Sequence, residues 1–81
     1  MTRVTLYGKP GCHLCEEAKE VVDAVRAEHP FELEEVDITR DPELESRYRE
    51  RIPVVAIDGQ EALELVVERS ELEERLASMA P

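Results

Sequence analysis

A β-hairpin signal in the second half of the chain limits the fold more firmly than any other feature. The apolar run IPVVAI (52–57) is followed by Asp58-Gly59, and EALELVVE (61–68) comes directly after Gln60. Asp-Gly readily adopts the positive φ angles that a two-residue type I′ turn requires. We therefore expect two antiparallel strands, at about 53–57 and 61–67.

A strand–helix–strand unit precedes this hairpin. RVTLY (3–7) is a β-rich run, and FELEEVDI (31–38) is a second one. In the second run the apolar alternation changes phase, which a bulge at Glu34–Glu35 would explain. Between the two runs, apolar residues recur at helical spacing from Cys12 or His13 to about Glu28. A right-handed crossover through this helix makes the two strands parallel. The apolar face of the helix comprises Leu14, Ala18, Val21, Val22 and Val25.

Two further helices complete the order. Asp41-Pro42 is a favourable helix entry and predicts a helix at 42–50. Ser70 and Glu73 fit a capping box for a last helix that buries Leu72 and Leu76. The order is then β-α-β-α-β-β-α, an α/β fold with a four-stranded mixed sheet and helices on both faces. We expect one domain over residues 1–81.

Charge and hydropathy exclude several classes of partner. The chain has 20 acidic and 10 basic residues and a net charge of −10. Such a surface repels nucleic acid and anionic membranes. No run approaches the roughly 20 apolar residues of a membrane-spanning helix, and no signal peptide precedes the first strand. We therefore expect a cytoplasmic monomer that binds neither nucleic acid nor membrane.

The two cysteines, Cys12 and Cys15, lie where the first strand turns into the first helix. At the helix start, unpaired backbone N–H groups and the helix dipole favour the thiolate of Cys12, which is the nucleophilic form. Cys15 lies on the apolar face and within disulfide reach. The spacing predicts that Cys12 attacks a substrate disulfide and that Cys15 resolves the mixed disulfide.

The cysteine pair has three other interpretations. A zinc site needs more ligands, and His29 would lie about 21 Å along the helix from Cys15. An iron–sulfur cluster shared between two chains remains open, because each chain would supply thiolates. Two small buried thiols without chemistry are the third interpretation. A C-x-x-C pair at a strand-to-helix junction favours redox chemistry over the other three.

The motif Lys9-Pro10-Gly11-Cys12-His13-Leu14-Cys15, the later Arg51-Ile52-Pro53 and the order of elements resemble the glutaredoxin branch of the thioredoxin-like family. The resemblance covers nearly the whole chain and implies the thioredoxin-like (glutaredoxin) fold. It also implies a cis Ile52–Pro53 bond that faces the cysteine pair, with the Ile52 backbone offering hydrogen bonds to the substrate. Lys9 matches the family lysine that pairs with a glutathione carboxylate. His13-Leu14 replaces the usual Pro-Tyr.

The function predicted from residues and resemblance together is that of a dithiol–disulfide oxidoreductase in cell redox homeostasis and electron transport. Cys12 and Cys15 are the catalytic residues, and the substrate is a disulfide on a protein or a small thiol. We expect no bound cofactor and no metal. Glutathione or a thioredoxin-reductase-like protein is the expected reductant, and glutathione is also a candidate cosubstrate. The alternative is a dimer that binds an iron–sulfur cluster without oxidoreductase turnover. The predicted substrate-binding residues are Lys9, His13, Leu14, Ile52 and Pro53.

Overall fold

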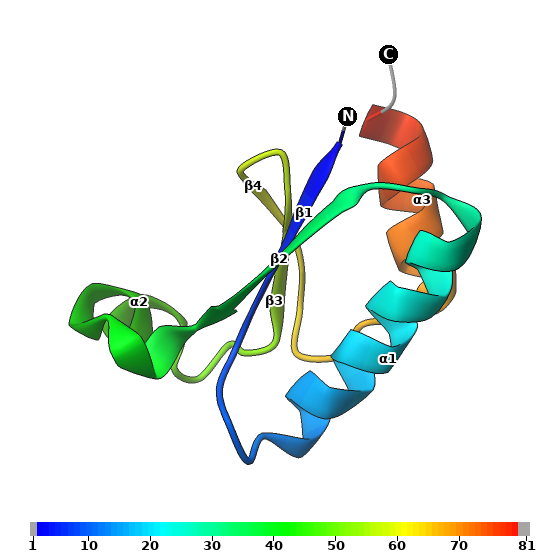
Figure 1. The fold of residues 1–81 in the computed structure, drawn as a ribbon. Helices are drawn as coiled ribbons and strands as arrows, with labels where there is room; N and C mark the ends of the chain where they lie inside the picture. Colours follow the sequence, from blue (N-terminus) through cyan, green and yellow to red (C-terminus); the bar gives the residue numbers. More distant parts are fainter. Residues whose placement is uncertain (1, 80–81) are drawn as a thin grey trace.

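The computed structural model describes residues 2–79 and shows one sheet with helices on both of its faces (Figure 1). The predicted order of strands and α-helices is confirmed, with one additional turn of 3-10 helix, η1. The elements are β1 (Arg3–Gly8), α1 (His13–Glu28), β2 (Glu32–Asp37), η1 (Ile38–Arg40), α2 (Pro42–Tyr48), β3 (Val54–Ile57), β4 (Gln60–Glu64) and α3 (Arg69–Met79).

The sheet is mixed, with strand order β2-β1-β3-β4. β1 pairs with β2 in parallel and with β3 in antiparallel orientation, so the predicted parallel pairing is confirmed. The predicted bulge at Glu34–Glu35 is wrong, because the register of β1 on β2 runs without a shift from Arg3 opposite Glu32 to Gly8 opposite Asp37. The strand ends at Asp37, and Ile38 begins η1, so strand alternation does not set where the Ile38 side chain points.

The hairpin has the predicted turn, with φ of 49° at Asp58 and 86° at Gly59. The hairpin is irregular between Val55 and Ala56, where the pairing register of β3 on β4 shifts. β4 ends at Glu64 rather than at the predicted residue 67. The strand ends there because Leu65 adopts a φ of 66°, which takes the chain out of the extended conformation.

α1 and α3 cover one face of the sheet, and α2 lies on the other (Figure 1). The larger core lies between the sheet and the α1–α3 layer, where Val4, Val22 and Leu72 are fully buried. The smaller core combines Cys15, Ile38, Tyr48, Ile52 and Val54, with Tyr7, Cys12 and Leu44 packed against it. The cysteine pair is therefore attached to the packing of the smaller core.

Three details of the helices differ from the predictions. α2 ends at Tyr48 instead of residue 50, although Asp41 caps it as expected by accepting from the Glu43 N–H at 2.9 Å. α3 begins at Arg69, which places Ser70 inside the first turn and not at the N-cap. Leu14 is 42% exposed, so the buried face of α1 begins only at Cys15. None of the helices within residues 2–79 has the length and apolar character to cross a membrane.

Candidate active site at the Cys12–Cys15 pair

The turn between β1 and α1 places Cys12 at the helix N-cap. Gly11 has a φ of 79°, a conformation that glycine adopts at little cost, and the Cys12 N–H donates to the Lys9 carbonyl at 3.4 Å. α1 then begins at His13. Cys12 and Cys15 are joined by a disulfide, with their Cα atoms 5.2 Å apart. The prediction that the two sulfurs lie within bonding reach is confirmed.

The two sulfurs differ in their surroundings. Cys12 is half-buried, whereas Cys15 is only 8% exposed and belongs to the smaller core. The Cys12 Sγ accepts a hydrogen bond from the backbone N–H of Cys15 at 3.2 Å. This N–H is one of the free donors of the first helical turn, where partial positive charge favours a negative sulfur. The arrangement therefore favours Cys12 as the sulfur that a substrate reaches and Cys15 as the sheltered one.

Three predicted site residues lie on the solvent side of the pair. Lys9 is exposed in the turn that precedes Cys12. His13 is also exposed, with 84% of its side chain accessible, and its Nε2 lies 3.9 Å from a carboxylate oxygen of Glu17. Leu14 leaves a partly exposed apolar side chain at the start of the helix. All three residues are thus exposed and lie within three positions of Cys12 in the chain.

The segment before β3 supplies the other two predicted residues. The Ile52–Pro53 bond is cis, as expected. Ile52 lies in the same buried cluster as Cys15 and is only 7% exposed. Pro53 is fully buried. The Ile52 N–H already donates to the Tyr48 carbonyl at 3.1 Å. The Ile52 N–H, one of the backbone groups expected to bind substrate, is therefore already used at the end of α2, and the expectation stays open for the Ile52 carbonyl.

Gly8 is a site residue that sequence reasoning missed. A Cβ at this position would lie 3.1 Å from the Cys15 Sγ and 3.2 Å from the Cys15 Cβ. The end of β1 therefore passes so close to the buried cysteine that a larger residue would displace it. The available signal was a glycine that directly ends a buried strand next to the C-x-x-C motif.

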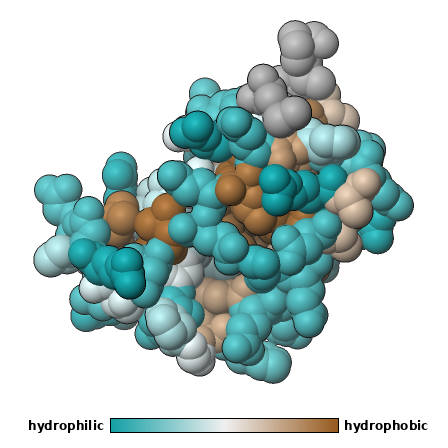
Figure 2. Space-filling view, viewed as in Figure 1, coloured by the Kyte–Doolittle hydropathy of each residue, from teal (hydrophilic) through white to brown (hydrophobic). Residues whose placement is uncertain are grey.

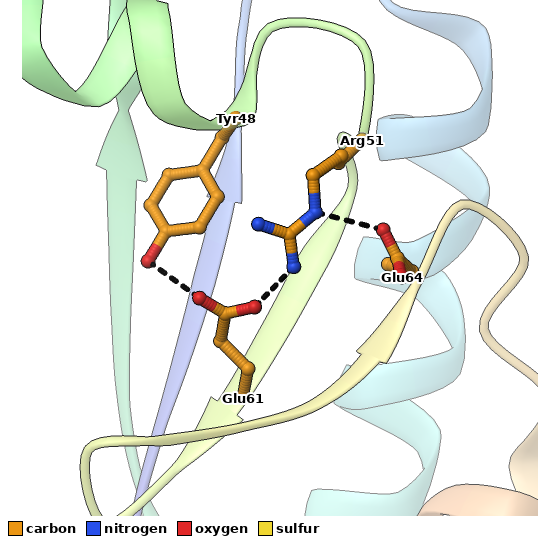
Figure 3. A network of polar contacts seen from close by, with 4 residues as sticks. All are labelled: Tyr48, Arg51, Glu61 and Glu64. Atoms are coloured by element: carbon orange, nitrogen blue, oxygen red, sulfur yellow. Dashed lines mark hydrogen bonds and ion pairs between the residues drawn. The ribbon is translucent and has the colours of Figure 1, made fainter.

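A polar network that the sequence did not reveal holds the segment around Ile52 against β4 (Figure 3). The Arg51 Nε donates to Glu64 at 2.9 Å, and Arg51 also forms an ion pair with Glu61. The Tyr48 hydroxyl donates to the other carboxylate oxygen of Glu61 at 3.3 Å. The Arg51 guanidinium lies 5.4 Å from the centre of the Tyr48 ring, and the Tyr7 ring stacks on the Tyr48 ring at a centroid distance of 4.6 Å.

This network also shifts ionisation. The hydrogen bond from Arg51 lowers the pKa of Glu61, so Glu61 stays charged near neutral pH. Burial, and then the charge of Glu61, raises the pKa of Tyr48, which keeps its hydroxyl proton and remains a donor. Both shifts favour the forms that the network uses, a charged Glu61 and a protonated Tyr48 hydroxyl.

A pocket of about 400 Å³ opens beside the pair, between the start of α1 and the C-terminal end of β2. Cys15 and Gly8 lie in its wall, together with Lys9 and the aliphatic Val36. The face of the molecule seen in Figure 2 is mostly hydrophilic, with apolar surface visible in its middle. Cys15 thus belongs to the smaller core and also lies in the wall of this pocket.

His29, considered above as a metal ligand for the cysteines, takes part in a different group. It caps the C-terminal end of α1, and its Nε2 lies 3.6 Å from Glu73 of α3. Glu28 and Glu73 both pair with Arg69. The Arg69 guanidinium thus already pairs with both carboxylates beside His29, and the group lies at the opposite end of α1 from the disulfide.

Comparison with known proteins places this geometry in a family. Residues 3–77 match the family model described as a glutaredoxin-like domain (DUF836). A crystal structure of the protein XcR50 from X. campestris is 34% identical, with a TM-score of 0.81 over 96% of this chain and 99% of that one. Protein Ne2328 from Nitrosomonas europaea is 26% identical, with a TM-score of 0.79 over 91% of this chain and 89% of that one.

A more distant likeness supports the fold alone. A mutant thioredoxin from Halobacterium salinarum is 19% identical and has a TM-score of 0.72, over 99% of this chain and 78% of that one. The sheet order, the helix placement and the cysteine pair at the start of α1 are those of a thioredoxin-like fold.

Proposed function

The chain belongs to the glutaredoxin-like domain family (DUF836), and we propose that it is a thiol–disulfide oxidoreductase that uses the Cys12–Cys15 pair. The observation that carries the proposal is the difference between the two sulfurs. One is half-buried at a helix N-cap and accepts a backbone N–H, while the other is buried three residues later. Disulfide exchange needs this asymmetry, because the attacking and the resolving thiol must act in a fixed order.

In the reduced protein, the N–H groups and the dipole at the helix N-terminus favour the thiolate form of Cys12. The Cys12 thiolate attacks one sulfur of the substrate disulfide, and the other substrate sulfur leaves as a thiolate that takes up a proton. Cys15 then loses its proton and attacks the Cys12 sulfur of the mixed disulfide. The second substrate thiolate leaves and is protonated. Two electrons pass from the protein dithiol to the substrate, and the protein ends as the disulfide seen in the structure.

The surrounding residues support binding of an extended substrate beside Cys12. We assign substrate contacts to Lys9, His13 and Leu14, which are exposed and close to Cys12 in the chain. The Ile52 carbonyl offers one hydrogen-bond acceptor, in the manner of strand addition. Pro53 is buried, and we assign it the role of holding the conformation of the segment that carries this carbonyl.

The cycle needs an external reductant that returns two electrons to the disulfide. A low-molecular-weight thiol such as glutathione or a thioredoxin-reductase-like protein would serve, and no resident cofactor is required by the exchange itself. Glutathione remains a candidate cosubstrate. We place this activity in redox homeostasis and electron transport of a reducing cytoplasm, where C-x-x-C pairs act catalytically, and we expect a monomer.

A redox titration in glutathione buffers, with alkylation and intact-mass analysis at each potential, tests the proposal. The expected result is a two-electron transition to an internal Cys12–Cys15 disulfide, at a potential in the range of about −270 to −120 mV that such pairs span. Cys15→Ser should trap a mixed disulfide on Cys12, whereas Cys12→Ser should form none. Free thiols at every potential would refute the oxidoreductase. Visible absorbance and iron in freshly purified protein, with no exchange activity, would support the cluster-binding alternative.

A further inference from the structure

Three large apolar side chains are exposed in the described part of the chain. Leu14 is 42% exposed, Leu65 44% and Val66 61%. Leu14 follows Cys12 by two residues, while Leu65 and Val66 lie in the connection between β4 and α3. We name these three residues the apolar rim.

Hydrogen bonds attach the β4–α3 connection to the segment around Ile52. The Leu65 N–H donates to the Pro53 carbonyl at 2.8 Å and to the Arg51 carbonyl at 3.2 Å. Ile52, between these two acceptors, shares the smaller core with Cys15, and Cys12 packs against that core. Figure 1 shows the start of α1, the segment before β3 and the connection after β4 at the same end of the sheet. The apolar rim therefore comes from two segments at the same end of the sheet as the cysteine pair.

The conformation of Leu65 is unusual for its residue type. Its φ of 66° lies in the left-handed region, which non-glycine residues seldom adopt. A large aliphatic side chain is thus held in a costly conformation and turned partly into solvent. Leu65 belongs to neither core cluster, so the exposed part of its side chain is available for contact with a partner.

The charges around the apolar rim are mostly negative. Glu16 and Glu17 follow Cys15, and Glu68 ends the β4–α3 connection. Glu64 begins that connection and is paired with Arg51, while Arg69, which follows Glu68, is paired with Glu28 and Glu73. Arg51, the cation nearest to Ile52 along the chain, is already paired with Glu61 and Glu64 (Figure 3). Lys9 remains as the exposed cation of the turn. Glutathione brings two carboxylates and little apolar surface, so it matches this environment poorly.

Resting on the proposed function, we propose that the substrate is a disulfide of a polypeptide segment with apolar, non-acidic residues next to its cysteine. The segment lies against Leu14 on one side and Leu65 and Val66 on the other while Cys12 attacks its sulfur. Apolar neighbours of the cystine are removed from water, and basic neighbours meet the surrounding carboxylates. Both contributions favour such a peptide over glutathione disulfide.

The test measures the rate of disulfide reduction by the reduced protein with three substrates at matched concentration. Two are symmetric disulfides of short peptides, one with Leu and Arg beside the cysteine and one with Glu at both places, and the third is glutathione disulfide. We expect the Leu–Arg peptide to react about tenfold faster than glutathione disulfide, the effect of burying roughly one additional aliphatic side chain. The Glu peptide should be slowest at low salt and should recover partly at about 0.5 M salt.

Variants of the apolar rim identify the surface. Leu65→Asn keeps the left-handed conformation, which Asn tolerates, while it removes the aliphatic side chain. Val66→Ser removes the second one and carries the test alone if Leu65→Asn unfolds in a urea titration. Each variant should slow the Leu–Arg peptide several-fold and leave the rate with glutathione disulfide within about twofold. That unchanged rate is the internal control for a merely structural effect.

The outcomes separate the two proposals. Glutathione disulfide reacting as fast as the Leu–Arg peptide, or rim variants with unchanged peptide rates, would overturn the polypeptide assignment and leave the oxidoreductase standing. Failure of the wild type to reduce any of the three substrates, with rates equal to those of Cys12→Ser, would overturn the proposed function itself.

Discussion

Replacing Gly8 by Ala should shift the reduction potential of the Cys12–Cys15 pair to a more positive value. The added Cβ would lie 3.1 Å from the Cys15 Sγ and 3.2 Å from the Cys15 Cβ, both closer than ordinary van der Waals contact. In the oxidised protein the bond to Cys12 holds the Cys15 sulfur in place. In the reduced protein that sulfur can rotate away from residue 8, so only the contact with the Cβ remains.

The magnitude follows from this difference. Overpacking of a buried site costs about 1–3 kcal/mol. If the sulfur contact accounts for about 1–2 kcal/mol and acts on the oxidised form alone, the potential rises by about 20–40 mV, since 1.4 kcal/mol corresponds to about 30 mV for two electrons. The contact with the Cys15 Cβ destabilises both forms, and the lower chain entropy of unfolded Ala offsets part of that common cost.

The assay is the redox titration described above, carried out on the wild type and on Gly8→Ala, together with urea unfolding of each protein in its oxidised and reduced forms. Gly59→Ala is the matched control. It adds a Cβ with nothing within 4 Å, at a φ of 86°, so its backbone strain acts equally on both redox forms. A Gly8→Ala potential that equals the wild-type value, or one that is more negative, would refute this reasoning.

Three further outcomes follow from the packing and the polar network. Leu72→Ala removes a fully buried side chain of the larger core and should lower the free energy of unfolding by about 2–5 kcal/mol in urea titrations, while the rate of Cys12 alkylation in the reduced, folded protein stays the same. The folded-state pKa of Tyr48 lies above its unfolded value of about 10. The contribution of Tyr48 to stability is therefore fully present below pH 10 and is lost as the pH rises beyond it. Tyr48→Phe should lack this loss of stability at alkaline pH. The measurement compares the unfolding midpoints of the variant and the wild type between about pH 9 and pH 11. Glu61 has a lowered folded-state pKa, so its contribution is present above its ordinary value of 4.5 and is lost as pH falls through the lower folded value, and Glu61→Gln should flatten that acid limb.

The order of elements and the cysteine geometry could be predicted because they depend on neighbours in the sequence. The Asp58-Gly59 turn needs only local φ preferences, and Cys12 reaches the helix N-cap because a glycine turn precedes an apolar period of about 3.6. The positions of the strand ends depend also on contacts with residues distant in the sequence. β4 ends early because hydrogen bonds from the Leu65 N–H to distant carbonyls of Arg51 and Pro53 fix a left-handed residue, which no local pattern signals.

The parts of the site that the sequence did not predict arise from packing between distant segments. Gly8 contacts Cys15 only because β1 and α1 fold back on each other. The pairing of Arg51 with Glu61 and Glu64 depends on the register of the hairpin after its shift at Val55/Ala56. With 20 acidic residues to choose from, the sequence offers no means of selecting these two partners.

The cysteine pair packs against Ile52, a residue far from it along the chain, and this has a consequence for biosynthesis. Both cysteines are translated well before Ile52, which follows Cys12 by 40 residues, so at about 5–20 residues per second the thiols wait several seconds for the segment that shelters them. During this interval the nascent chain is open to oxidants. It contains only two cysteines, however, so it has a single intramolecular pairing available. Premature oxidation within the chain therefore yields the native bond, and a wrong disulfide requires a second molecule.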